Sequence, residues 1–499
     1  MTSSHVRVCL MLLGLPGLEA ANILFFMFPS YSHISGPLVV ARELAERGHV
    51  VWNALPTELA NHKALQSPGV SILHYKSLDN FNIEEEMHRY VESKDMSMIF
   101  DASKKACDLI LRDGQLLGHM RGMKFDLIIF DSTPLPKMLT ILAYKLDVPF
   151  AFVAAVFEPQ ASRTPFNPSS TPFPIYPWSP EMKFSARFAN VLFMLGWYIY
   201  NPFSYYGAVA TYAPEKPDLT LEALIAKGSL WLISQEPLAD YPRATLPNVK
   251  HIGSLSASNV NPLPDKYKKF MEVAKDGVVI VSFGSNVKHL PIGVAKKLVD
   301  AFSRTKYRYI FKTDETISVG PNILLTDWMP QSDLLAHPNT KLFITHCGAN
   351  GQSEAFLNGV PMIGYPIFAE QPSNALKLEY FGFGLSMDIE SFTVEDLVSN
   401  INEVIQNSSY SQKIKKAAEI TKLRKRSPKD EAVYWIEHVL TYGGAHLRSY
   451  CQDIPLYQYL CLDVIGLVVF FLHVCIFLIW KSCGYCYRTI AHRPKEKLQ

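Results

Sequence analysis

The sequence predicts an α/β protein with two parallel sheets, joined by a linker and followed by a helix that spans a membrane. Short apolar runs alternate with helical patterns in two separate series, which is typical of parallel sheets covered by helices on both faces. A polar stretch separates the two series, and one long apolar run lies near the carboxyl terminus. A chain of 499 residues is too long for one core and suits two domains with appendages.

The first domain is predicted at residues 22–252. Helical patterns at residues 35–48 and 134–147 separate some of its strands. The predicted strands are the apolar runs at residues 22–29, 50–56, 70–75, 125–131 and 149–155.

The linker is predicted at residues 253–264, where small and polar residues predominate. The second domain follows at residues 265–445 and repeats the alternation of strands and helices. Residues 410–440 look helical. The predicted strands are the runs at residues 278–284, 307–312, 323–328, 342–346, 360–366 and 385–389.

Residues 161–217 break this alternation, because they are crowded with proline and aromatic residues. The apolar run at residues 191–200 is too short to span a bilayer. It could lie at a membrane surface, line a pocket, or pack beneath a long loop. An apolar, aromatic segment of this kind favours a lipophilic ligand.

The amino terminus is predicted to be a secretory signal peptide at residues 1–21. Arg7 precedes an apolar stretch, and the small pair Ala20 and Ala21 follows it.

A membrane-spanning helix is predicted at residues 460–480, with a tail at residues 481–499. The length suffices only if Asp463 lies at the membrane interface, and the alternative is a buried core helix. Basic residues follow the run, so the tail is expected in the cytoplasm and the bulk of the chain in the lumen. The result is a single-pass type I protein that binds membrane lipid.

The net charge of +2 is small for this length and argues against a nucleic-acid partner. The cysteine spacing defines no disulfide framework. Asn407, in the sequence Asn-Ser-Ser, is a candidate glycosylation site, which would suit a luminal domain.

A turn between two strands of the second domain predicts a phosphate site. Cys347, Gly348 and Gly351 lie where a strand gives way to a helix that starts at about Asn350. Unpaired N–H groups and the helix dipole favour negative charge at such a position, and a diphosphate suits it.

Residues on both sides of this turn are suited to the rest of a nucleotide sugar. Trp328 offers a flat face for a base, and Glu354 can accept hydrogen bonds from ribose hydroxyls. Glu370 and Gln371 could bind a sugar.

The stretch from Trp328 to Gln371 resembles the signature of the UDP-glycosyltransferases, which include glucuronosyl- and glucosyltransferases. The resemblance implies the GT-B fold, in which two Rossmann-like domains face each other across a cleft. It also implies that the last helices, within residues 410–440, cross back onto the first domain. Glu370 stands where the animal glucuronosyltransferases usually have Asp, so the choice of sugar stays open. The positions that fit the signature are Trp328, Gln331, His346, Gly348, Asn350, Gly351, Glu354, Pro361, Pro366 and Gln371.

Two residues of the first domain are candidates for catalysis. His33 follows the first predicted strand and Asp131 ends the strand at residues 125–131, so both face the carboxyl edge of the sheet. A histidine is a suitable base near neutral pH, and a carboxylate can orient it and stabilise its charged form. The resemblance implies the same two roles.

The leaving diphosphate is assigned to the second domain. Ser285 follows the strand at residues 278–284, and His346 precedes the glycine-bearing turn. Both are expected to stabilise the diphosphate together with the N–H groups near Asn350 and Gly351.

The resemblance, together with His33 as base, implies an inverting enzyme that moves a glucuronosyl or glucosyl group from a UDP-sugar to a hydroxyl of a small lipophilic acceptor. One alternative uses UDP-glucose only, and another is an inactive membrane protein that binds lipophiles. No cofactor or metal is expected, because the sequence has no Asp-x-Asp pattern. Whether the protein forms a homo-oligomer stays open. Lys495 and Lys497 resemble a signal for retention in the endoplasmic reticulum, although a solvated basic tail is the alternative.

Overall fold

The computed structural model describes residues 19–59, 62–76, 97–133, 137–154, 157–174, 176–199, 205–256, 260–284, 290 and 293–491. Three predictions therefore lie outside the described residues: almost all of the signal peptide, Ser285, and the two lysines of the tail. The described chain forms two compact units, which divide between Arg448 and Ser449.

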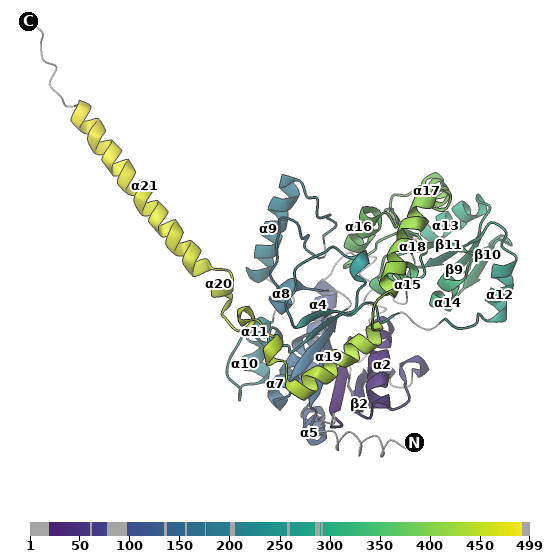
Figure 1. Ribbon diagram of the computed structural model, residues 1–499, viewed down its shortest axis with the longest axis horizontal. Helices are drawn as coiled ribbons and strands as arrows, with labels where there is room; N and C mark the ends of the chain where they lie inside the picture. Colours follow the sequence, from purple (N-terminus) through teal and green to yellow (C-terminus); the bar gives the residue numbers. More distant parts are fainter. Residues whose placement is uncertain are drawn as a thin grey trace, which may run out of the picture. The chain divides into compact units, whose positions relative to one another are not determined.

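The first unit contains two separate parallel sheets (Figure 1). The first sheet has seven strands in the order β3-β2-β1-β4-β5-β6-β7. Its strands are β1 (Asn22–Phe26), β2 (Val50–Pro56), β3 (Val70–Tyr75), β4 (Leu127–Asp131), β5 (Phe150–Ala154), β6 (Trp231–Ile233) and β7 (Val249–His251).

Both faces of this sheet are buried, as the continuous apolar strands require. Leu24 and Phe26 of β1 lie in one cluster of buried side chains, whereas Ile23 and Phe25 lie in another. The alternation follows from the pleat, which turns successive side chains to opposite faces. The helices of this part are α2 (Tyr31–Glu46), α4 (Ser97–Arg112), α5 (Gly114–Met123), α7 (Thr140–Leu146), α8 (Pro159–Ser162), α9 (Phe184–Ile199), α10 (Ala208–Tyr212) and α11 (Leu221–Ile225).

The second sheet has six parallel strands in the order β10-β9-β8-β11-β12-β13. Residues Val278 and Ile280 of β8 face one buried cluster, and Val279 and Val281 face the other. The strands are β8 (Val278–Ser282), β9 (Arg308–Lys312), β10 (Ile323–Thr326), β11 (Thr340–Thr345), β12 (Met362–Gly364) and β13 (Gly384–Ser386).

Helices cover this second sheet as well, and Asn350 and Gln371 lie in the first turns of two of them, α15 and α16. The helices of this part are α12 (Asp265–Glu272), α13 (Val294–Ser303), α14 (Gln331–Ala336), α15 (Ala349–Leu357), α16 (Gln371–Phe381), α17 (Val394–Gln406) and α18 (Ser408–Lys422), and they are followed in the chain by α19 (Pro428–Tyr442).

Helix α19 returns to the first sheet, which confirms the expectation that the last helices cross back. Its residues Val433 and Ile436 are buried in the same cluster as Ile23 of β1, and burial of each such side chain is worth about 1.5–3 kcal/mol. Arg47 at the end of α2 also donates a 3.1 Å hydrogen bond to Glu437. Helix α2, near the start of the unit, and helix α19, near its end, therefore both pack on the first sheet.

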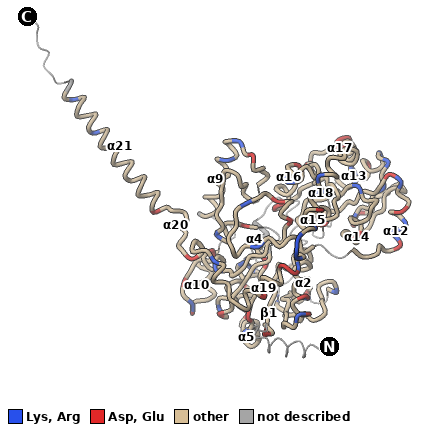
Figure 2. The backbone as a smooth tube through the Cα atoms, in the orientation of Figure 1, with Lys and Arg blue, Asp and Glu red and all other residues tan. Residues whose placement is uncertain are grey.

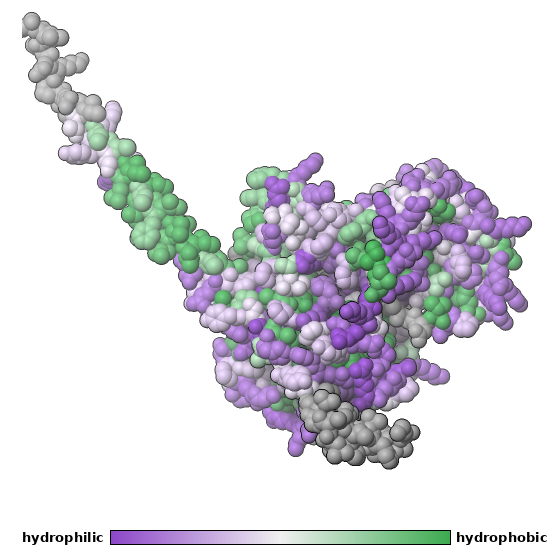
Figure 3. Space-filling model, in the orientation of Figure 1, coloured by the Kyte–Doolittle hydropathy of each residue, from purple (hydrophilic) through white to green (hydrophobic). Residues whose placement is uncertain are grey.

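The sequence prediction missed the short strands β6 and β7 at one edge of the first sheet. Each has only three residues, which is too short to show a period. Within residues 161–217, the structure forms helix α9, whose exposed residues include Phe184, Phe188 and Leu192. Figure 3 shows apolar atoms gathered over this helix.

The second unit contains the short helix α20 (Leu456–Tyr459) and the long helix α21 (Leu462–Ala491). Residues 462–489 form a helix long and apolar enough to cross a membrane, and Figure 2 shows its middle free of charged residues. Asp463 stands in its first turn, where the helix dipole favours an acidic side chain. The helix continues past residue 480, where the sequence prediction had ended it.

Candidate active site

The imidazole of His33 and the carboxylate of Asp131 contact each other directly. Nδ1 of His33 lies 2.6 Å from Oδ2 of Asp131. The other oxygen of Asp131 accepts a 2.8 Å hydrogen bond from the main-chain N–H of Thr133. Because both oxygens are engaged, the carboxylate is fixed in place, and Nε2 of His33 is left for a further partner.

Sheet topology explains why these two residues meet. Strands β1 and β4 are parallel neighbours, with Phe26 opposite Phe130, so their carboxyl ends lie at the same edge. Asp131 is the last residue of β4, and His33 lies in the first turn of α2, which follows β1. The sequence therefore brings together an acid and a base that are 98 residues apart.

The surroundings of His33 raise its pKa above the usual value. Burial lowers this pKa, but the charge and hydrogen bond of Asp131 and the charge of Glu370 together outweigh burial. Glu370 belongs to the start of α16 in the second half of the unit. The site thus joins groups from both halves, with His33 only 24% exposed.

Helix α15 begins at the glycine-bearing turn that the sequence singled out. Gly348 is its N-cap, and no side chain caps this end, so N–H groups of the first turn are left for a ligand. Asn350, in that first turn, donates a 2.8 Å hydrogen bond to the carbonyl of Ser32. The helix start therefore lies beside the turn that carries His33.

His346 lies between two glycines. A Cβ atom added to Gly284 would lie 2.7 Å from both Cε1 and Nε2 of His346, and one added to Gly348 would lie 2.5 Å from Nε2. Neither position has room for a side chain. Burial lowers the pKa of His346 to about 4, assisted by the positive charge of Lys312. The imidazole is therefore neutral near pH 7.

Trp328 and Glu354 were predicted to bind the nucleoside, and Gln331 belongs to the same UDP-sugar signature. Trp328 is 63% exposed, so its ring is accessible to a base. Gln331 donates a 2.7 Å hydrogen bond to Glu354. Burial raises the pKa of Glu354 to about 7, although the hydrogen bond from Gln331 opposes this shift.

Helix α16 begins with the two residues predicted to bind the sugar. Glu370 is the N-cap, and burial raises its pKa. Gln371 is only 2% exposed, and its Oε1 accepts hydrogen bonds from the main-chain N–H groups of Ile367 and Phe368. The side-chain oxygen of Gln371 is therefore used to hold its own loop, a role that sequence reasoning missed.

Two non-glycine residues adopt left-handed backbone conformations beside these helix starts. Cys347 has φ of 67° and Ala369 has φ of 53°. Such conformations are costly for residues with a side chain and tend to occur at functional sites. They precede the two helix starts that carry the candidate donor-binding residues.

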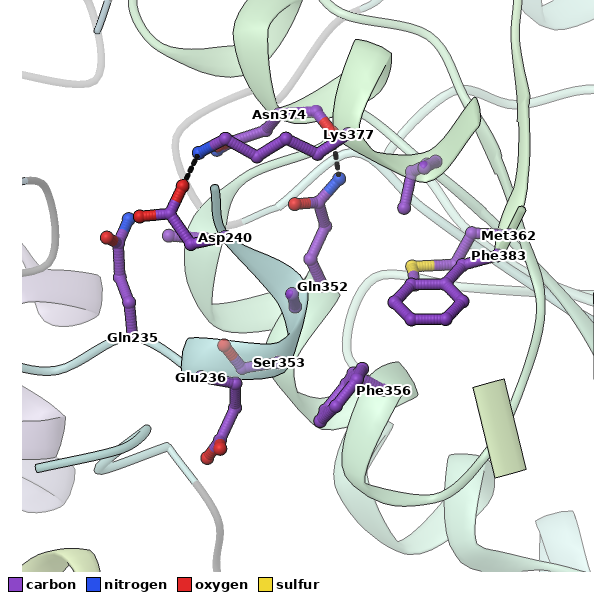
Figure 4. A pocket seen from close by; sticks show the side chains of 13 residues that line it. Gln235, Glu236, Asp240, Gln352, Ser353, Phe356, Met362, Asn374, Lys377 and Phe383 are labelled. Atoms are coloured by element: carbon purple, nitrogen blue, oxygen red, sulfur yellow. Dashed lines mark hydrogen bonds and ion pairs between the residues drawn. The ribbon is translucent and has the colours of Figure 1, made fainter. Parts of the chain in front are cut away.

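The sequence did not predict a pocket of mixed polar and apolar lining that adjoins these residues (Figure 4). It lies between residues 235–240 and the helices α15 and α16. Lys377 of α16 forms a 2.8 Å ion pair with Asp240, and Gln352 donates a hydrogen bond to the carbonyl of Asn374. Both contacts are drawn in Figure 4. No local pattern marks Asp240 or Lys377, because their partners lie far away in the sequence.

The two remaining site predictions concern the surface and metals. Asn407 is exposed, and its Nδ2 donates a 2.8 Å hydrogen bond to Glu403, so glycosylation at Asn407 stays a prediction. Among the described residues, no three His, Cys, Asp or Glu side chains are placed to share a metal ion.

Two parallel α/β sheets with helix starts directed at a shared site define the GT-B class of glycosyltransferases. Comparisons with solved structures agree. The glycotransferase of kitacinnamycin superposes with a TM-score of 0.62 at 18% identity, covering 84% of this chain and 98% of that one. A variant of Os79 from O. sativa in complex with UDP gives 0.61 at 16% identity, with coverage of 84% and 100%.

Sequence comparison identifies the family. Residues 30–497 match the sequence model described as UDP-glucoronosyl and UDP-glucosyl transferase. UDP-glucuronosyltransferase 1A5 of Rattus norvegicus is 30% identical over 513 residues, covering 98% of this chain and 96% of the relative. The chain therefore belongs to the UDP-glycosyltransferase family, and it is a glycosyltransferase with a UDP-sugar as donor.

Proposed function

We propose that this enzyme transfers a glucuronosyl or glucosyl group to a hydroxyl of a small lipophilic acceptor, with His33 as the general base. The observation that carries this proposal is the 2.6 Å contact between Nδ1 of His33 and Asp131. The contact favours the tautomer in which Nδ1 carries the proton, so Nε2 is free to accept one.

In the proposed reaction, Nε2 of His33 removes the proton of the acceptor hydroxyl as the oxygen attacks the anomeric carbon. The carboxylate of Asp131 stabilises the imidazolium that forms. The bond between the anomeric carbon and the diphosphate oxygen breaks on the opposite side, and UDP leaves. Attack in line with the leaving group inverts the anomeric centre, so an α-linked donor gives a β-glycoside.

The leaving diphosphate is assigned to the start of α15. Free N–H groups in the turn after Gly348 supply donors, and the helix dipole favours the charge that develops. His346 is neutral and is held beside this turn, where it can donate one further hydrogen bond. Since these groups stabilise the leaving charge, we expect the reaction to proceed without a metal ion, and activity in excess chelator tests this.

The rest of the donor is assigned to residues on either side. Trp328 stacks on the uracil, Glu354 with Gln331 binds the ribose, and Glu370 with Gln371 binds the hexose. The exposed face of Trp328 and the pairing of Gln331 with Glu354 support these assignments.

A lipophilic acceptor is supported by the aromatic character of residues 161–217. Helix α9 exposes large apolar side chains such as Phe184 and Phe188. The proposed location is the membrane of the endoplasmic reticulum, with both sheets in the lumen and α21 as the anchor. Protease added to sealed microsomes should then remove only the tail that follows α21, whereas digestion of the sheets would contradict this orientation.

A transfer assay tests the proposed function. Microsomes with the full-length protein are incubated with a set of phenols and either UDP-glucuronate or UDP-glucose, and products are identified by mass. A β-glycoside that forms with the wild-type protein and is lost in His33→Ala supports the proposal. UDP-sugar binding without any transfer would instead favour a lipophile-binding protein.

A further inference from the structure

A buried series of polar contacts joins the half of the unit that contains the first sheet to the glycine-bearing turn before α15. It begins at Asp240, in the segment that follows β6, and continues to Lys377 of α16. Asn374, on the same helix, contacts both Lys377 and the main chain of Cys347. Figure 4 shows Asp240, Lys377 and Asn374 on one side of the pocket, with the ion pair drawn. The proposed transfer reaction uses none of these contacts.

Asn374 fixes one peptide bond of the turn. Its Nδ2 donates a 3.1 Å hydrogen bond to the carbonyl of Cys347, and the residue is only 4% exposed. The peptide bond between Cys347 and Gly348 is trans and planar, so the N–H of Gly348 points away from the carbonyl that Asn374 holds. Within the described chain, this N–H donates no hydrogen bond. Asn374 therefore directs a free donor of the turn that is assigned to the diphosphate.

The turn depends on such contacts because its backbone is strained. Cys347 is fully buried and has φ of 67°. A residue with a side chain keeps this left-handed conformation where the surrounding structure enforces it. The N–H of Cys347 donates a 3.3 Å hydrogen bond to Oγ1 of Thr345, and its carbonyl accepts the shorter bond from Asn374. Loss of the shorter bond should therefore let the peptide bond rotate.

Lys377 sets which end of the Asn374 amide faces Cys347. Its Nζ lies 3.3 Å from Oδ1 of Asn374, one turn earlier on α16. An ammonium group can donate hydrogen bonds but cannot accept them, so it holds the amide oxygen. The amide nitrogen is then left to donate to the carbonyl of Cys347. Without Lys377, nothing on this side would distinguish the observed amide orientation from the flipped one.

Asp240 holds the ammonium of Lys377 in place. Oδ1 of Asp240 lies 2.8 Å from Nζ, and the two side chains are 7% and 12% exposed. Burial acts to raise the pKa of Asp240, but Lys377 and Arg243 outweigh burial and lower that pKa to about 2. The pair is therefore charged at neutral pH, and its separation would leave an uncompensated buried charge. Oδ2 of Asp240 accepts a 2.5 Å hydrogen bond from Arg243, which takes no part in the contacts that lead to Cys347.

We propose that Asn374 and Lys377 are positioning residues for the transfer reaction, which direct the N–H of Gly348 at the leaving diphosphate without touching the donor themselves. This inference rests on the proposed function, which assigns the diphosphate to the start of α15. Charge builds up on the diphosphate as its bond to the anomeric carbon breaks, so a misdirected donor costs both binding and rate. Because Asp240 belongs to the other half, the geometry of the diphosphate site is linked to the contact between the halves.

Equilibrium binding to the full-length protein in detergent tests this inference. The ligands are uridine, UDP and UDP-glucuronate, and the variants are Asn374→Ala, Lys377→Met and the two combined. Arg243→Gln is the matched control. Like Lys377→Met, it removes one positive charge from beside Asp240, but it leaves the contacts from Asp240 to Cys347 intact. Thermal unfolding shows whether each variant is folded at the temperature of the titration, and Lys377→Met should fold because Asp240 stays paired with Arg243.

Asn374→Ala should lower the affinity for UDP by about 10-fold, the loss of roughly one hydrogen bond. The affinity for UDP-glucuronate should fall by the same factor, and that for uridine should not change because uridine has no diphosphate. Lys377→Met should lower UDP affinity by about 3- to 10-fold. The combined variant should lose no more than Asn374→Ala alone, because the two residues act through one contact. Arg243→Gln should leave all three affinities unchanged.

Other outcomes would overturn the inference. Equal weakening of uridine and UDP would indicate a general structural role, and weakening of UDP-glucuronate alone would indicate direct contact with the sugar. If Arg243→Gln weakened UDP as much as Lys377→Met, charge alone would explain the loss. Losses that multiply in the combined variant would show two independent effects, and unchanged UDP affinity in Asn374→Ala would show none.

The proposed function is judged separately, by transfer with the wild-type protein. Transfer to an acceptor would still support that function if the binding results overturned the positioning role. Conversely, the expected pattern of binding without transfer to any acceptor would support the positioning role and count against the proposed function.

Discussion

The side-chain amide of Asn350 donates a 2.8 Å hydrogen bond to the main-chain carbonyl of Ser32. Asn350 lies in the first turn of α15, and Ser32 lies in the first turn of α2, directly before His33. The helix start that is proposed to hold the diphosphate is thereby joined to the turn that holds the proposed base. The contact fixes the relative positions of the two groups that are proposed to act on opposite sides of the anomeric carbon.

Asn350→Ala should therefore lower kcat more than it lowers UDP affinity. Loss of the bond to Ser32 lets the two turns shift, and a misplacement of about 1 Å can cost about 100-fold in rate. Steady-state kinetics together with UDP binding measure the two effects. Asn402→Ala, on α17, is the control. Equal losses of kcat and UDP affinity would indicate that Asn350 acts on the diphosphate itself.

His33→Ala should lower turnover by about 10²–10⁴-fold, because proton removal from the acceptor is lost. UDP affinity should stay within a factor of about two, since the proposed donor site belongs to the other sheet. Retained turnover, or a matching loss of UDP affinity, would show that His33 is not the base.

Asp131→Asn tests the charge that supports His33. The base must be neutral to act, so wild-type kcat/KM should fall as pH decreases through the raised pKa of His33. The substitution removes the charge of Asp131 while burial still lowers that pKa, so the acidic limb should move to lower pH. The plateau should also drop by about 10²–10⁴-fold, because the imidazolium loses its counter-charge. An unmoved acidic limb would show that another group titrates.

Local patterns were enough to predict the pairing of His33 with Asp131. Each lies at or just after the carboxyl end of a parallel strand, and both strands are recognisable as continuous apolar runs. The carboxyl ends of neighbouring parallel strands lie at the same edge of the sheet, regardless of the length of the loops that connect them. The glycine-bearing turn after β11 likewise predicted the start of α15 to within one residue.

Contacts between the two halves could not be predicted in this way. The bond from Asn350 to Ser32 joins residues 318 positions apart, and the ion pair between Lys377 and Asp240 is also long-range. Both contacts depend on the position of one sheet relative to the other, and the local hydrophobic periodicity of the sequence contains no information on that position.

Trp328→Ala and Gln371→Glu should separate binding of the base from binding of the sugar. Trp328→Ala should weaken UDP and UDP-sugar alike, by about 1–3 kcal/mol, because both contain the stacked base. Gln371→Glu keeps the oxygen that accepts from Ile367 and Phe368 but removes the amide donor, so only the intact UDP-sugar should bind more weakly. Isothermal titration with both ligands measures the contrast. Equal weakening of UDP by Gln371→Glu would place the hexose elsewhere.

Two glycines with similar backbones allow a test of His346. Gly284 has φ of 88° and Gly293 has φ of 82°, so an alanine at either position meets a similar backbone strain of about 1 kcal/mol. A Cβ at Gly284 would lie 2.7 Å from the imidazole of His346, whereas at Gly293 nothing lies within 4 Å.

Gly284→Ala should therefore displace His346 and lower UDP affinity by about 10-fold or more, the loss of roughly one hydrogen bond to a charged group. Gly293→Ala should lower the thermal midpoint to a similar degree and leave UDP affinity unchanged. Thermal unfolding and UDP titration of both variants provide the comparison. If the two variants bound UDP equally well, His346 would not contribute to the diphosphate site, and the N–H groups of α15 alone would have to stabilise the leaving charge.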